Sequence, residues 1–166
     1  REVQARPAEV ELLAQHRPKL VYTIPSFHNP TGQTLALECR ERLVELSREH
    51  GFVIAADEVY QLLHHGTPPP ASFGTLAERG NVVSLGSFSK ILAPGLRLGW
   101  IQANPELMQR MLAQGALVSG GNFNHFASHV VRQLMESGQL ATFVDHLREA
   151  YAARAAGVPC KIVVID

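Results

Sequence analysis

The sequence predicts an α/β domain built on a mainly parallel sheet, and three observations lead to this prediction. Short apolar segments alternate along the chain with segments whose apolar residues recur at the helical period. In these apolar segments polar and apolar residues do not alternate. Such continuous apolar runs are typical of strands buried on both faces. The composition, with 46% apolar and 18% charged residues, is that of an ordinary globular domain. We find no internal repeat and no linker that would separate two domains.

Strands are expected where apolar and β-branched residues run together between turn-forming segments. The first run, KLVYTIP, is followed by SFHNPTG, which is dense in turn formers and is expected to form a loop over residues 26–32. Residues 86–94, which include Lys90, are expected to form another loop. The four expected strands cover residues 19–25, 52–56, 81–85 and 96–102.

Helices are expected in most of the remaining chain. In the second helical segment, apolar residues follow the helical period up to Gly51, a residue type that commonly ends helices. The expected helices cover residues 7–16, 34–50, 105–118, 123–136 and 140–155. The last residues, 161–166, have the composition of a strand, but the pattern assigns them no place in the sheet.

Polar residues follow three of the expected strands. Asn29 follows the first strand, Asp57 ends the second, and Lys90 follows the third. Because ligands of open α/β sheets gather at the carboxyl ends of the strands, we expect these three side chains to lie at one edge of one sheet.

The residue types at this edge suit a particular chemistry. A lysine beside a buried strand can be partly desolvated, which lowers its pKa and makes Lys90 a better nucleophile towards a carbonyl. A carboxylate that ends a buried strand, such as Asp57, needs a positive partner, and a protonated pyridine nitrogen would be one. The planar guanidinium of Arg97 suits a phosphate, to which Ser87 and Ser89 could donate further hydrogen bonds.

Each residue also has a simpler interpretation. Asp57 after a strand is typical of a helix N-cap. Asn29 beside Pro30 is typical of a turn. Tyr60, close after Asp57, could be a core aromatic, and Arg97 could form an ion pair at the surface.

Several other classes of function find no support in the sequence. Fifteen basic residues balance fifteen acidic ones, so no nucleic-acid partner is expected. No apolar run approaches the roughly 20 residues that span a bilayer, so no membrane partner is expected. His125 and His129 lack the intervening Glu of a zinc protease motif, and the two cysteines, Cys39 and Cys160, show no metal-ligand spacing. We therefore expect no metal site and a reduced, cytoplasmic protein.

Four motifs carry a resemblance to a known family. NPTG at 29–32, DEVY at 57–60, SFSK at 87–90 and GLRLG at 95–99 resemble the ordered signature set of class I/II aminotransferases, which are fold-type-I enzymes dependent on pyridoxal 5′-phosphate. Their candidate residues are 28, 33 and 7 positions apart. The sequence around these motifs is similar to that of the branch of 2-aminoadipate, kynurenine and aromatic aminotransferases. The resemblance extends from about residue 19 to about residue 154.

The resemblance implies roles around the ring of the cofactor. Lys90 would form the Schiff base and would later move the proton. Asp57 would pair with the pyridinium nitrogen, which keeps the ring an electron sink. Asn29 and Tyr60 would donate hydrogen bonds to the ring oxygen O3′.

The resemblance also implies a phosphate site and a larger assembly. Ser87, Ser89 and Arg97 would hold the phosphate. Residues 1–166 would form part of the large domain, a three-layer α/β/α unit, without the family's N-terminal phosphate loop and C-terminal small domain. The full-length protein would be a homodimer that acts on amino acids and 2-oxo acids, and the activity of this stretch alone would be in doubt.

Three alternatives remain open. The chain could be the cofactor-binding domain of a transcription regulator, because some regulators carry an aminotransferase-like domain. It could also be an inactive fragment, since residues 155–166 depart from the family pattern. Finally, the same motifs allow β-elimination or decarboxylation in place of amino transfer.

Overall fold

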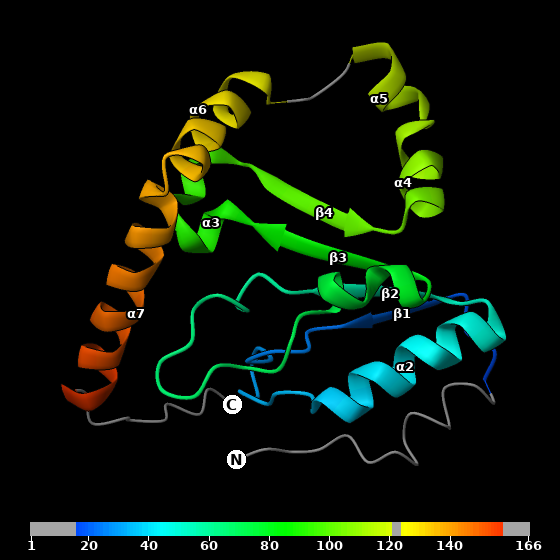
Figure 1. Cartoon of the computed structure of the whole chain (residues 1–166), viewed down its shortest axis with the longest axis horizontal. Helices are drawn as coiled ribbons and strands as arrows, with labels where there is room; N and C mark the ends of the chain where they lie inside the picture. Colours follow the sequence, from blue (N-terminus) through cyan, green and yellow to red (C-terminus); the bar gives the residue numbers. More distant parts are fainter. Residues whose placement is uncertain (1–15, 121–123, 158–166) are drawn as a thin grey trace, which may run out of the picture.

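A four-stranded sheet forms the centre of the computed structural model, which describes residues 16–120 and 124–157 (Figure 1). The order of the strands is β1-β2-β3-β4, with β1 parallel to β2, β2 parallel to β3, and β3 antiparallel to β4. The predicted α/β class and mainly parallel sheet are confirmed. The strands are β1 Leu20–Thr23, β2 Val53–Asp57, β3 Val82–Ser87 and β4 Gly99–Ala103.

The helices follow the expected order with shifted bounds. The expected helix over 105–118 is divided in two at residues 113–114, and the expected helix over 7–16 and strand over 161–166 lie outside the described residues, apart from His16. The α-helices are α2 Leu37–His50, α3 Phe88–Ile91, α4 Pro105–Leu112, α5 Gly115–Gly120, α6 His125–Glu136 and α7 Gln139–Gly157, and the 3-10 helices are η1 Phe73–Arg79 and η2 Pro94–Leu96.

Two predictions around Lys90 are wrong in detail. Residues 86–94 are not one loop, because β3 continues to Ser87 and Lys90 lies on the short helix α3. The strand expected over 96–102 begins only at Gly99, because η2 ends at Leu96 and Arg97 adopts a left-handed conformation with φ 47°. The apolar side chains of Leu96 and Leu98 pack against the buried cluster around α3, which explains why an apolar run here is not part of a strand.

One face of the sheet packs against α2 and η1. The apolar face of α2 meets the inward side chains of β2 and β3, and Gly51 ends the helix at φ 75° with its N–H bonded to Ser47 O. Each large side chain that becomes fully buried contributes roughly 1.5–3 kcal/mol. The core of this layer contains Leu43, Val44, Leu46, Phe52, Ile54, Phe73 and Val82.

The described residues leave the opposite face of the sheet open. Leu20 and Tyr22 on β1 are each 59% exposed, and Ile101 on β4 is 46% exposed. Of the three layers that the family resemblance implies, residues 16–120 and 124–157 therefore supply the sheet and one helical layer.

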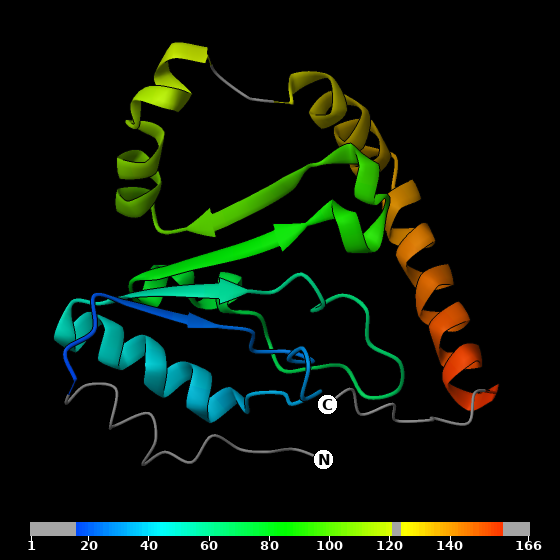
Figure 2. The ribbon, with the colours of Figure 1, turned by 180° about the vertical axis from the view of Figure 1, so that it is seen from behind.

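Helices α6 and α7 lie at the end of the sheet where β1, β2 and β3 finish, as both views of the ribbon show (Figures 1 and 2). Val131 of α6 and Val144 of α7 form a second buried cluster with Phe88 and Ile91 of α3. No helix in the described ranges is both long and apolar enough to cross a membrane.

Gly86 permits close packing next to the lysine. It is paired with Trp100 across β3 and β4, and a Cβ atom at Gly86 would lie 2.0 Å from Trp100 Cε2. The Trp100 ring also packs against Phe88, with ring centroids 4.8 Å apart. Trp100 therefore fixes the segment that leads from β3 into α3.

We expect Gly86→Ala to lower the free energy of unfolding by about 1–3 kcal/mol, because the added methyl group must displace the Trp100 ring. Urea unfolding followed by circular dichroism measures the change. Gly115→Ala is the matched control, since no atom lies within 4 Å of a Cβ built there. Equal stability of the two variants would show that Trp100 does not restrain this segment.

Candidate active site

The carboxyl edge of the sheet gathers the candidate residues from four strands. Asn29, Asp57 and Lys90 follow or end the parallel strands β1, β2 and β3, as predicted. Arg97 precedes β4, which runs antiparallel to β3. Because an antiparallel strand begins at the edge where its neighbour ends, Arg97 lies at the same edge as Lys90. A parallel β4 would have placed it at the opposite edge.

Asn29 is exposed in the turn that follows β1. Two backbone hydrogen bonds close this turn, from His28 N to Gln33 O at 2.8 Å and from Gly32 N to His28 O at 2.6 Å. Gly32 has φ 70°, which disfavours a side chain at this position. In the described structure no hydrogen bond joins Asn29 to the other candidate side chains.

Asp57 is held by a tyrosine that the sequence analysis did not single out. Tyr22 Oη donates a hydrogen bond to Asp57 Oδ2 at 2.7 Å. The backbone N–H of Val59 makes a longer contact of 3.5 Å with Oδ1. Residues 59–62 form turns and not a helix, so Asp57 is not a helix N-cap. The strand register shows why Tyr22 reaches Asp57. Its partner Ala55 lies two residues before Asp57, so the side chains of Tyr22 and Asp57 are on the same face of the sheet.

Lys90 and Tyr60 face one another across the edge. Lys90 Nζ lies 6.0 Å from the centroid of the Tyr60 ring. Lys90 is exposed, so the desolvation expected from the sequence is not supplied by the described residues.

The three residues expected at the phosphate are next to one another. Ser87 Oγ accepts a hydrogen bond from Ser89 N at 3.1 Å, which caps α3 and leaves the Ser87 hydroxyl proton available to donate. Arg97 Nη1 donates to Ser89 Oγ at 3.5 Å and to Pro94 O at 3.3 Å. Arg97 is exposed and pairs with no carboxylate among the described residues, so its guanidinium can receive an anion.

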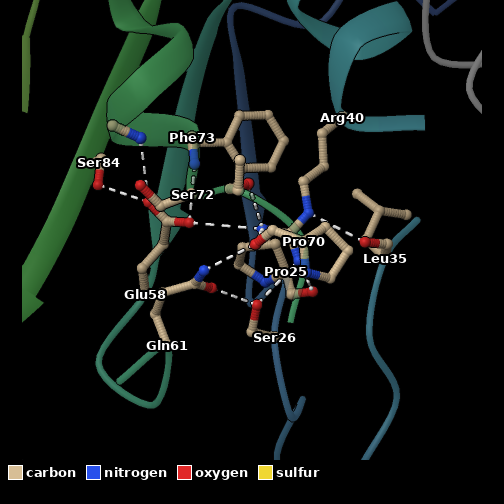
Figure 3. Close-up of polar contacts among 12 residues, drawn as sticks. Pro25, Ser26, Leu35, Arg40, Glu58, Gln61, Pro70, Ser72, Phe73 and Ser84 are labelled. Atoms are coloured by element: carbon tan, nitrogen blue, oxygen red, sulfur yellow. Dashed lines mark hydrogen bonds and ion pairs between the residues drawn. The ribbon is translucent and has the colours of Figure 1, made fainter. Parts of the chain in front are cut away.

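A buried arginine, Arg40, contacts the segments that follow β1 and β2 (Figure 3). Arg40 on α2 is completely buried, and burial lowers the pKa of its guanidinium while the Glu58 charge raises it in part. Its nitrogen atoms donate to five oxygens at distances of 2.8–3.4 Å. The acceptors are the carbonyl oxygens of Pro25, Leu35, Pro70 and Ala71 and the hydroxyl of Ser26.

Glu58 is the buried counterion of Arg40. Its Oε1 lies 3.8 Å from Arg40 Nη1 and accepts a hydrogen bond from Phe73 N at 2.9 Å. Its Oε2 accepts from Ser84 Oγ at 2.6 Å and from Gly74 N at 3.3 Å. Glu58 thus joins the end of β2 to η1 and to β3.

The Arg40–Glu58 pair therefore sets the positions of two loops of the site. Ser26 also donates to Gln61 Oε1, and Gln61 Nε2 donates to Pro70 O at 2.8 Å (Figure 3). The loop before Asn29 and the residues that flank Tyr60 consequently share one buried network. Sequence reasoning missed Arg40, because a charged residue on a helix normally indicates the solvent-facing side.

An apolar cavity lies apart from these residues. It has a volume of about 630 Å³ and lies between β4, α3, α6 and α7, where Phe88, Trp100, Val131 and Leu140 are among the residues that line it. None of the seven candidate side chains lines this cavity. The amine, the carboxylate and the guanidinium that suit a cofactor site lie at the carboxyl edge of the sheet and not in the lining of this cavity.

The fold and this edge define an α/β protein that presents a lysine, a strand-ending carboxylate and a possible anion site together. The family model described as "Aminotransferase class I and II" matches residues 7–159, and the chain belongs to that family. The family resemblance of the four motifs is thereby confirmed.

Three comparisons show which individual proteins the chain is similar to. It is 36% identical over 150 residues to the 2-aminoadipate transaminase of Thermus thermophilus, covering 87% of this chain and 37% of that protein. It is 32% identical over 154 residues to the uncharacterized HTH-type transcriptional regulator YisV of Bacillus subtilis, which covers 83% of this chain and 31% of that protein. Its structure matches that of Pyrococcus horikoshii kynurenine aminotransferase with a TM-score of 0.78 and 32% identity. The match covers 88% of this chain and 38% of the Pyrococcus chain. The chain spans about a third of the length of the curated relatives it matches.

We expect Arg40→Met to lower the free energy of unfolding by about 3–5 kcal/mol, because it leaves Glu58 buried without its counterion. Arg79→Met is the matched control, since Arg79 forms an exposed ion pair with Glu41 at 2.8 Å and should cost less than about 1 kcal/mol. Guanidinium unfolding of both variants measures the difference. Similar losses would mean that the buried pair does not hold the loops.

Proposed function

We propose that this chain forms the cofactor-binding part of a pyridoxal 5′-phosphate-dependent aminotransferase, which transfers an α-amino group from an L-amino acid to a 2-oxo acid. The observation that carries the proposal is Lys90, an exposed lysine at the carboxyl edge with Nζ 6.0 Å from the Tyr60 ring. Membership of the class I and II family supports it. The Pyrococcus relative, which was solved with PMP, supports the choice of cofactor.

The donor set at the edge fits this cofactor. The bound cofactor would supply a ring that withdraws electrons from the α-carbon of the substrate. Asp57 is an acceptor suited to a protonated ring nitrogen, and a carboxylate there would hold the proton in place. Tyr60 and Asn29 would donate hydrogen bonds to the ring oxygen.

Lys90 would act on both the cofactor and the substrate. Its Nζ would hold the cofactor covalently and, once released, would carry a proton between carbon atoms of the substrate and the cofactor. The position of Lys90 Nζ, 6.0 Å from the centroid of the Tyr60 ring, supports this role, because it brings the amine close to a second residue proposed to contact the cofactor.

Ser87, Ser89 and Arg97 would bind the phosphate. The contact of 3.5 Å between Arg97 Nη1 and Ser89 Oγ supports the assignment, because it brings a cationic fork and a hydroxyl together at one point.

We further propose that this site is covered by polypeptide beyond the described residues, in a homodimer. Asn29, Lys90 and Arg97 are exposed, and the face of the sheet that carries Tyr22 is open. Polar and charged groups of a site act strongly only where water is excluded. The isolated stretch is therefore expected to bind the cofactor weakly and to show no measurable amino transfer.

A regulatory role is the second candidate, because the chain is 32% identical to YisV over 83% of its length. A regulator would bind the cofactor without turnover. The two candidates differ in one measurement: an enzyme loaded with the cofactor converts an added amino acid to its 2-oxo acid, with the amino group left on the cofactor.

We expect borohydride reduction of the cofactor-loaded protein, produced from its natural reading frame, to attach the cofactor to Lys90. Peptide mapping by mass spectrometry identifies the modified residue. Lys90→Ala should abolish the modification and the visible absorbance of the bound cofactor. Lys19→Ala is the matched control, because Lys19 precedes β1 at the opposite edge of the sheet.

A modified Lys19 or Lys161, or unchanged absorbance in Lys90→Ala, would falsify the assignment. Residues 1–166 contain three lysines, at positions 19, 90 and 161, so peptide mapping distinguishes Lys90 from the other two.

A further inference from the structure

Tyr22 makes its polar contact with a residue of the proposed site. The side chain lies on the open face of β1 and is 59% exposed, yet its hydroxyl donates to Asp57 Oδ2 at 2.7 Å. An exposed phenol can satisfy its hydroxyl with water, so packing does not require this hydrogen bond. The bond is also not local, because the two residues are 35 positions apart in sequence.

The sheet itself brings the two side chains together. Tyr22 is paired with Ala55 in the parallel register of β1 and β2. Asp57 is two residues beyond Ala55, so both side chains project from the same face as diagonal neighbours. The contact is therefore a consequence of the strand register and does not depend on the conformation of a loop.

The hydrogen bond engages one carboxylate oxygen and leaves the other less occupied. Oδ2 accepts from the Tyr22 hydroxyl, whereas Oδ1 has only the long contact of 3.5 Å with Val59 N. Each carboxylate oxygen has two acceptor sites, so Asp57 can still accept a hydrogen bond from a ring nitrogen.

We infer that Tyr22 is a positioning residue of the cofactor site: its hydroxyl orients the Asp57 carboxylate towards the ring nitrogen of the cofactor, where that carboxylate would hold a proton. This inference rests on the proposed function, because it requires Asp57 to face a pyridine nitrogen.

The direction of the effect follows from hydrogen-bond chemistry. Without the hydrogen bond from Tyr22, the Asp57 carboxylate can rotate about its side-chain bonds, which weakens its contact with the ring nitrogen. A weaker contact with the carboxylate stabilises the protonated ring nitrogen less. The hydrogen bond to Asp57, followed by burial and by the charge of Asp57, raises the pKa of Tyr22, so the phenol remains a proton donor at neutral pH.

The test uses ¹⁵N-labelled pyridoxal phosphate bound to the protein produced from its natural reading frame. The ¹⁵N chemical shift of the pyridine nitrogen reports whether that nitrogen carries a proton. In Tyr22→Phe we expect the signal to move towards that of the neutral ring. We also expect kcat to fall about tenfold, because that is roughly the effect of losing one hydrogen bond to an ionised group.

Two reference variants make the result decisive. Asp57→Asn removes the carboxylate and should give the full shift towards the neutral ring. Tyr151→Phe removes an equivalent hydroxyl from α7, where the ring contacts Arg154, and should leave the signal at the wild-type position.

The outcomes separate the inference from the function on which it rests. If Asp57→Asn shifts the signal and Tyr22→Phe does not, Tyr22 has no positioning role. Tighter cofactor binding by Tyr22→Phe would also overturn the inference, because the hydroxyl would then compete with the cofactor for Asp57. If neither variant shifts the signal, or the protein binds no labelled cofactor, the proposed function itself fails.

Discussion

The buried pair of Arg40 and Glu58 is the interaction on which the geometry of the site depends. Two charges removed from water are stable only when hydrogen bonds satisfy their remaining donors and acceptors. Arg40 satisfies this requirement with oxygens from three segments, and Glu58 does so with η1 and β3. The loops after β1 and β2 therefore cannot move independently. Asp57 directly precedes Glu58, so the residue that anchors the network also fixes the neighbouring carboxylate.

The directions of the strands account for the rest of the arrangement. Three parallel strands bring Asn29, Asp57 and Lys90 to one edge, and the reversal of β4 brings Arg97 to that edge as well. The pairing of Gly86 with Trp100 then fixes the segment that leads from β3 into α3, the helix that carries Lys90. The same sheet places Tyr22 beside Asp57. Positions on the sheet, and not a preformed cavity, thus bring the polar groups of the site together.

The sequence predicted the strands and their common edge, because contiguous apolar runs separated by turn formers encode buried parallel strands. It did not predict the left-handed conformation of Arg97, since that turn depends on the packing of Leu96 and Leu98 against α3. It also did not predict the burial of Arg40, because helical charge patterns normally indicate solvent exposure. The open face of β1 was missed for a related reason: an apolar run does not reveal that Tyr22 is exposed.

A crystal structure of the protein with pyridoxal phosphate bound tests the central claim most directly, namely that this edge of the sheet is a cofactor site. We expect continuous electron density from Lys90 Nζ to the cofactor and a ring nitrogen within hydrogen-bond distance of Asp57. We also expect the phosphate to contact Ser89 and Arg97. Density that joins the cofactor to another lysine, or a phosphate bound away from Arg97, would contradict the account.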